Sequence, residues 1–137
     1  MDDSSKLSEV EVGITIAQSV QTQQVGMQQQ QTIINPVKII RSPYIPSALS
    51  LAISCVIIGL DQHVEHTFKI KIENNSTKEL VFSSSQNQLN ANPDTDNVVI
   101  NADLKNIGFP NDGKYNTIIE VDHKSYSSAF YVFKADK

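Results

Sequence analysis

The chain has 137 residues, of which 39% are apolar and 19% are charged, a composition that suits one folded domain with a single core. The formal net charge is −4 and the eleven basic residues are scattered singly, so the clustered Lys and Arg of a nucleic-acid-binding surface are missing. The longest apolar run, 49–60, is shorter than the about 18–20 residues of a membrane span. We therefore expect neither nucleic acid nor a membrane among its partners.

The polar N-terminus, together with the lack of an apolar run long enough for a membrane span, predicts a cytoplasmic protein. Residues 1–9 are acidic and polar, unlike a secretory signal, and we expect them to form a disordered tail before a single β-sandwich domain over 10–134. Cys55 has no second cysteine to pair with. Because it lies in an apolar run, a small buried side chain is expected there, not a reactive thiol.

The first elements are a strand and a long hairpin. Apolar and polar residues alternate over 10–20, which is the period of a half-buried strand. Eight glutamines follow within 18–31, a composition that can also be disordered or prone to aggregation. We favour a glutamine-rich hairpin that turns at Gly26. The return strand, 32–40, is expected to break or bulge at Asn35-Pro36, because proline cannot donate to a ladder.

Three strands are expected in the middle of the chain. After a rigid connector at 42–47, the run 49–60 is apolar on both faces and predicts a central strand that is covered on both sides. Alternation over 65–73 predicts a half-exposed strand, and a tight turn separates it from a short strand at 79–82. The polar stretch 83–97 predicts a long loop, of a length that is often functional or mobile.

Three more strands are expected in the C-terminal part. Apolar residues alternate over 98–104, 115–121 and 126–133, with turns at 109–113 and 122–125 between them. The whole chain therefore contains about eight short strands and no helical period. This pattern predicts an all-β fold, an antiparallel β-sandwich.

Three segments resemble the motifs of a known family. They are a strand that begins Glu65-His66, the stretch 106–115 with its Phe109-Pro110 turn, and the hairpin 121–124. Together they resemble the DUF6941-like family of small bacterial β-sandwich proteins of unknown function, over roughly 34–133. The resemblance implies an immunoglobulin-like sandwich of seven to eight strands and no enzymatic activity. The family commonly has glycine where this chain has His123, which leaves the type of the last turn open.

A tyrosine corner is predicted at Asp112-Gly113-Lys114-Tyr115. In such a corner the ring packs in the core, and the hydroxyl donates a hydrogen bond to the backbone a few residues upstream. Immunoglobulin domains carry a cysteine two residues later, where this chain has Thr117. The corner is therefore expected without the disulfide.

One cluster has side chains of the kind that bind metals: Asp61, His63 and His66. In an extended strand the two histidines point to opposite faces, and a fourth ligand is missing, so a structural role for His66 is favoured. No nucleophile elbow and no glycine-rich phosphate loop is present, and Asp94 and Asp96 fit a solvated loop. We therefore predict no catalytic residue, no metal-binding residue and no cofactor.

The predicted function is a non-enzymatic, cytoplasmic binding or adaptor module that acts through protein–protein contacts. The alternative is a structural or assembly subunit of a phage or other particle, because the tail 1–9 and the glutamine-rich hairpin resemble arms that become ordered in an assembly. Frequent isoleucine and asparagine suggest an AT-rich bacterial or phage genome.

Self-association is also expected, most simply as a two-fold dimer. The first strand, 10–20, is uncharged over most of its length, so it has little protection against pairing with another edge. The last strand, 126–133, has aromatic residues on both faces and is either core or interface. A homo-oligomer that pairs through one of these strands is therefore the predicted assembly.

Overall fold

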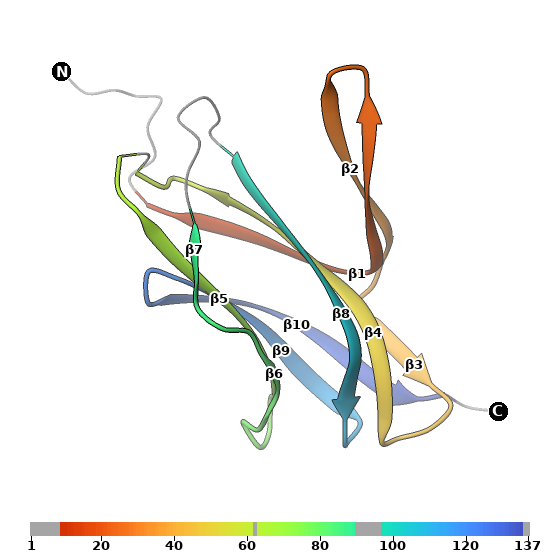
Figure 1. The fold of residues 1–137 in the computed structure, drawn as a ribbon. Coiled ribbons are helices and arrows are strands. Elements are labelled where there is room, and N and C mark those ends of the chain that lie inside the picture. The colour runs from red at the N-terminus through yellow and green to blue at the C-terminus, as the bar shows by residue number, and fades with distance from the viewer. Residues whose placement is uncertain (1–8, 62, 90–96, 136–137) are drawn as a thin grey trace.

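A computed structural model describes residues 9–61, 63–89 and 97–135, and over these residues it contains ten strands and no helix (Figure 1). The all-β prediction is confirmed. The strands are β1 (Glu11–Val25), β2 (Gln28–Pro36), β3 (Ile39–Ser42), β4 (Ser47–Ile58), β5 (His66–Asn74), β6 (Leu80–Ser83), β7 (Asn87–Leu89), β8 (Asn97–Phe109), β9 (Gly113–Val121) and β10 (Lys124–Lys134).

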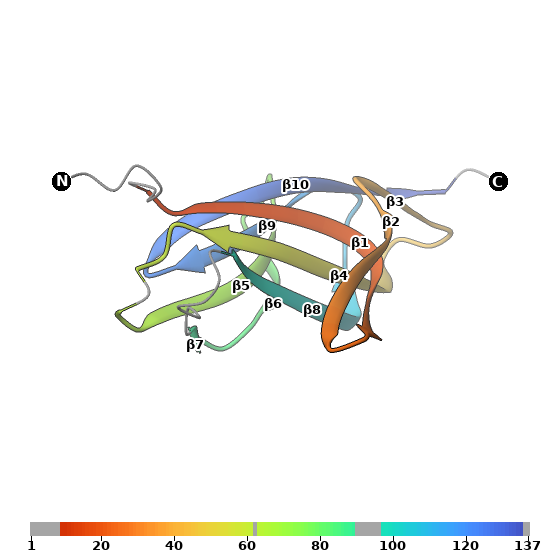
Figure 2. The same ribbon diagram turned by 90° about the horizontal axis from the view of Figure 1, so that it is seen from above.

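The strands form two sheets that pack face to face as a sandwich (Figure 2). One sheet has the order β2-β1-β4-β8. The other has the order β3-β10-β9-β5-β6, and β7 also pairs with β5. All pairs are antiparallel except β3–β10, which is parallel. The prediction of a purely antiparallel sandwich is therefore wrong at this one pair.

The strand count is ten, not seven to eight, for two reasons. The expected strand 32–40 is divided, because Asn35 has a φ of 51° and Pro36 ends β2. After this break the chain crosses to the other sheet, where β3 pairs with β10. The second reason is β7, which lies inside the stretch that was expected to be a loop over 83–97. Residues 90–96 of that stretch, which include Asp94 and Asp96, lie outside the described residues.

The core lies between the two sheets, and β4 is central within its sheet, but the prediction that both its faces are covered is wrong, because Ala48, Ser50 and Val56 on its outer face are exposed. β4 has a neighbour on each side, β1 and β8, and its residues 51–55 are buried without a break. The core side chains that are buried most completely include Tyr115, Phe109, Phe130, Ile53, Ile57, Ile72, Ile119 and Val132. Burying so many large apolar side chains is the main source of stability in a sandwich without a disulfide.

The tyrosine corner is confirmed. The ring of Tyr115 is fully buried, and its hydroxyl donates to the carbonyl oxygen of Asn111 at 2.5 Å. Phe109 packs edge-on against Tyr115 with the ring centroids 4.9 Å apart, and Phe130 stacks on Tyr115 at 6.0 Å. Thr117, at the position where immunoglobulin domains have cysteine, is also fully buried. These contacts fix the end of the sandwich that includes the turn at Pro110.

The first and last strands each have a second neighbouring strand over only part of their length. β1 pairs with β4 over 11–17 and with β2 from Ala17 onward. β10 pairs with β9 over 124–132 but with β3 only over 131–134. Self-association through either strand therefore remains a prediction. On β10, Phe130 is buried in the core, while Tyr131 and Phe133 lie half-buried with their rings stacked at 5.8 Å.

Candidate functional site

The most prominent surface feature is a hairpin arm, residues 18–35, which is the part of the β1–β2 hairpin beyond the last contact with β4. Ala17 is the last residue of β1 to pair with β4, opposite Ala52, and from there onward β2 is the partner of β1. Figure 1 shows the arm rising away from the body of the sandwich. The chain turns at Gly26, which has a φ of 63°. The glutamine-rich hairpin of the sequence thus forms an ordered two-stranded ribbon.

The arm buries little and carries no charge. Every residue over 21–31 is exposed, including Val25 at 50% and Met27 at 99%. The chain has no charged residue between Glu11 and Lys38. A two-stranded ribbon of this kind is marginally stable in water, and charged residues that would protect it against pairing with other chains are missing. Both properties are typical of a segment that contacts a partner.

Side-chain hydrogen bonds between amides hold the base of the arm. The amide of Asn35 donates to Oε1 of Gln18 at 2.6 Å, across the two strands. Oε1 of Gln31 accepts from Asn101 on β8 at 2.5 Å and from Thr22 at 3.1 Å. The base therefore has a defined direction relative to the sandwich, while the tip projects beyond it.

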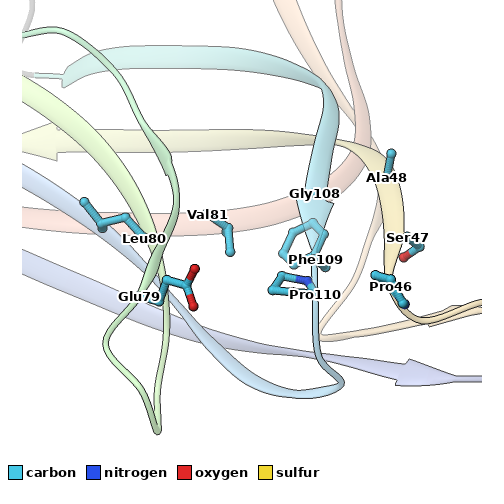
Figure 3. Close-up of a pocket in the computed structure, with 9 residues that line it drawn as sticks. All are labelled: Pro46, Ser47, Ala48, Glu79, Leu80, Val81, Gly108, Phe109 and Pro110. Atoms are coloured by element: carbon cyan, nitrogen blue, oxygen red, sulfur yellow. The ribbon is translucent and has the colours of Figure 1, made fainter.

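A second feature is an open cleft of about 550 Å³ between the edges of the two sheets (Figure 3). Its walls are the start of β4, the end of β8 and the segment that enters β6. β6 and β8 are edge strands of different sheets and do not pair with each other. The cleft is lined by Pro46, Ser47, Ala48, Glu79, Leu80, Val81, Gly108, Phe109 and Pro110.

The lining of the cleft is mainly apolar with two polar groups. Figure 3 shows Glu79 and Val81 on the side that faces Phe109 and Pro110, and Leu80 on the other side. The carboxylate of Glu79 is one polar group. The other is the hydroxyl of Ser47, which is buried and has no hydrogen-bond partner among the described residues. A buried hydroxyl without a partner is costly, and because this oxygen is buried, the carboxylate of Glu79 is the polar side-chain group that the cleft offers to a ligand.

The predicted metal cluster is not assembled. His63 is exposed and its backbone N–H donates to the side chain of Asp61 at 2.9 Å, whereas His66 is buried at the start of β5. Among the described residues, no three His, Cys, Asp or Glu side chains come together in a way that could hold a metal ion. His66 instead contacts the carboxylate of Asp122 and the backbone carbonyl oxygen of Asp61, and these contacts agree with the structural role that the sequence favoured.

His66 ties the start of β5 to two turns. Its Nδ1 lies 2.5 Å from Oδ2 of Asp122, and its Nε2 lies 2.7 Å from the carbonyl oxygen of Asp61. A backbone carbonyl and an ionised carboxylate are both acceptors, so this arrangement favours the imidazolium form, in which both ring nitrogens carry protons. Asp122 is held further by the backbone N–H of Thr67, which donates to its Oδ1 at 2.9 Å. The sequence identified both residues but not their contact.

The pKa values of this pair are shifted in opposite directions. Burial acts to lower the pKa of His66, but the hydrogen bonds to Asp122 and Asp61 and the nearby negative charges outweigh it and raise that pKa. Burial acts to raise the pKa of Asp122, but the hydrogen bonds from His66 and Thr67 outweigh it and lower that pKa. Both shifts favour the charged pair.

The turn that carries Asp122 resolves the question that His123 left open. Asp122 has a φ of 51° and His123 a φ of 71°, and two successive positive φ values are what a two-residue type I′ hairpin requires. The turn therefore keeps this form without the usual glycine. The bonds from His66 and Thr67 help to hold Asp122 in its left-handed conformation.

Cys55 is buried, with 1% of its surface exposed, as predicted. Burial raises the pKa of its thiol to about 11, against a smaller lowering by a backbone hydrogen bond at Ile100. The thiol is thus protonated at neutral pH and is a poor nucleophile.

In the described part of the chain, no helix has the length and apolar character needed to cross a membrane.

Comparisons with known proteins identify a family but no activity. A family model described as "Family of unknown function (DUF6941)" matches residues 13–132. None of the curated proteins matches the chain. A similar solved structure is that of a β-glucosidase from Listeria innocua in complex with glucose, with a TM-score of 0.47 and 10% sequence identity. The match covers 90% of this chain but only 16% of that enzyme. It gives no information about the function of this chain.

Proposed function

Because the chain belongs to the DUF6941 family, whose function is unknown, we propose its role from the geometry: it is a non-enzymatic, cytoplasmic binding module that acts through protein–protein contacts. The observation that carries the proposal is the arm, residues 18–35. It extends from the sandwich, has no charge, and is exposed on both faces over 21–31. The partner that we propose first is another copy of the chain.

The physical reason lies in what the arm lacks. Two strands without a core beneath them gain little from burial, and an edge strand without charges has no barrier to association. Contact with a second protein surface removes Val25 and Met27 from water, and burying each such side chain contributes about 1.5–3 kcal/mol. Because the arm is uncharged, copies of the chain do not repel each other at this site.

Two finer parts of the proposal have their own support. The cytoplasmic location is supported by the lone buried thiol of Cys55, since a small exported domain would more often rely on disulfides. An immunoglobulin-like arrangement of the sandwich is supported by the tyrosine corner at Tyr115. A role as an assembly subunit is the second candidate, favoured by the same arm, because arms of this kind connect repeated copies in particles.

The experiment is a measurement of molar mass by light scattering over a series of protein concentrations. The wild-type mass is expected to rise above the 15.2 kDa of one chain as the concentration increases. Met27→Glu places a charge on the most exposed residue of the arm, where it cannot disturb the core, and is expected to keep the protein monomeric.

The matched control is Val64→Glu, which adds the same charge at another exposed apolar residue, 53% accessible and outside the arm. This variant is expected to associate like the wild type. A wild-type protein that stays at the mass of one chain at every concentration contradicts the proposal. Equal loss of association in both variants assigns the effect to net charge and not to the arm.

A further inference from the structure

We infer that the tip of the arm of one copy docks into the cleft between β6 and β8 of another copy. The inference rests on the proposed function, because it names both the partner and the receiving surface. The occupant is the turn of the hairpin, with Val25 and Met27 as its apolar side chains. The receiving surface is the part of the cleft formed by Pro46, Val81 and Pro110, above the buried ring of Phe109.

The first argument is the match of apolar surfaces. Met27 is 99% exposed and Val25 is 50% exposed, and they are the apolar residues nearest the turn. The cleft, about 550 Å³ in volume, has room for more than one side chain and is lined mainly by apolar atoms. Methionine is flexible enough to fill an irregular apolar hollow. An exposed apolar tip and an unfilled apolar cleft on the same chain are therefore complementary.

The second argument is the match of polar groups. The cleft presents the carboxylate of Glu79, whereas the hydroxyl oxygen of Ser47 beside it is buried. The tip presents the amide of Gln28 and that of Gln24, whose Nε2 donates one of its two N–H groups to the carbonyl oxygen of Gly26 at 3.0 Å. Amide N–H groups donate to carboxylate oxygens. The arm has no acidic residue that Glu79 would repel.

The arm points away from the cleft of its own chain. The arm leaves the sheet at Ala17, which pairs with Ala52, and Figure 1 shows it extending away from the end of β8 where Phe109 and the cleft lie. The tip therefore does not reach its own cleft while the base keeps its pairing. Docking must occur between copies. Because tip and cleft are different surfaces, two copies that exchange arms reciprocally form a two-fold dimer, whereas a one-way contact builds a chain or a larger ring.

The test is disulfide formation between two variants that each carry one introduced cysteine and are mixed in equal amounts. Met27→Cys places a thiol at the tip and Ala48→Cys places one in the lining of the cleft. The native Cys55 does not interfere, because it is 1% exposed and has a thiol pKa of about 11. Val64→Cys is the control partner, beyond the end of β4 opposite to the cleft.

The expected result is a linked dimer of Met27→Cys with Ala48→Cys that forms at least about tenfold faster than the dimer with Val64→Cys. If Met27→Cys links mainly to itself, the arms pair with each other, so the inference is overturned and the proposed function stands. If the link to Ala48→Cys is no faster than the control while light scattering shows association through the arm, the inference again fails alone. If light scattering shows a monomer at all concentrations, both fail.

Discussion

The bridge formed by His66 is expected to make a measurable, pH-dependent contribution to stability. The informative change is His66→Leu, which replaces the imidazole by an apolar side chain of similar size and so removes both hydrogen-bond donors. The carbonyl oxygen of Asp61 and the carboxylate of Asp122 then lose their hydrogen bonds. The exposed His63 allows the same substitution outside the bridge, and His63→Leu is the matched control.

The size of the effect follows from the surroundings of the two bonds. The bond from Nε2 to Asp61 involves a buried, charged donor, and such a bond contributes about 1.5–3 kcal/mol. The side chain of Asp122 is 44% exposed, so water screens its ion pair with His66 and its contribution is at most about 1 kcal/mol. We therefore expect His66→Leu to lower the free energy of unfolding by about 2–3 kcal/mol near pH 5.5.

The sign of the pH dependence follows from the two shifts. The pKa of His66 is raised on folding, so its contribution is complete below its ordinary value of about 6.5 and is lost as the pH rises through the folded pKa. The pKa of Asp122 is lowered on folding, so its contribution is complete above about 3.9 and is lost as the pH falls through the folded pKa. The bridge is therefore strongest between about pH 4 and pH 6.5.

The assay is urea unfolding of the wild type and both variants at about pH 5.5 and about pH 8.5. The wild type and His63→Leu are expected to lose stability between these pH values, and His66→Leu is expected to lose clearly less. A wild-type stability that does not fall with pH, or falls equally in His66→Leu, refutes the argument that the buried imidazole is a cation. Nitrogen NMR of the ring provides a direct check of its two protons.

Three other predictions concern single residues. Tyr115→Phe removes the bond to Asn111 and is expected to lower the free energy of unfolding by about 1 kcal/mol in a urea titration. Cys55 is expected to react with a disulfide reagent at neutral pH only after unfolding, which a colorimetric thiol assay shows. Gly59→Ala is expected to destabilise the fold by more than about 1 kcal/mol in thermal melts, because Gly59 has a φ of 86° and an added Cβ would meet the backbone carbonyl oxygen of Glu9.

Local patterns predicted most of the fold. The run 49–60 is apolar on both faces and became β4, which has a neighbour on each side. The spacing around Tyr115 predicted the corner, because this motif depends on residues that are close in sequence. What local patterns could not predict is which sheet each strand joins. Residues 32–40 look like one interrupted strand, yet Asn35 and Pro36 send its two parts into different sheets.

The candidate site depended on long-range contacts and was missed for that reason. The cleft brings together the start of β4, the entry to β6 and the end of β8, three segments that are far apart in sequence. The contact between His66 and Asp122 spans 56 positions. The arm was the exception, because its glutamines and missing charges were visible in the sequence. Its direction away from the sandwich was visible only in the structure.

The central claim is that the arm is a contact surface between copies, and amide hydrogen exchange along the arm tests it most directly. Residues 21–31 form a ribbon with no core beneath it, so their amides are expected to exchange rapidly in dilute protein. As the protein concentration rises, exchange over 21–31 is expected to slow in the wild type, while Met27→Glu keeps the rapid rates of the dilute protein. Wild-type arm amides that exchange at the same rate at every concentration would contradict the account.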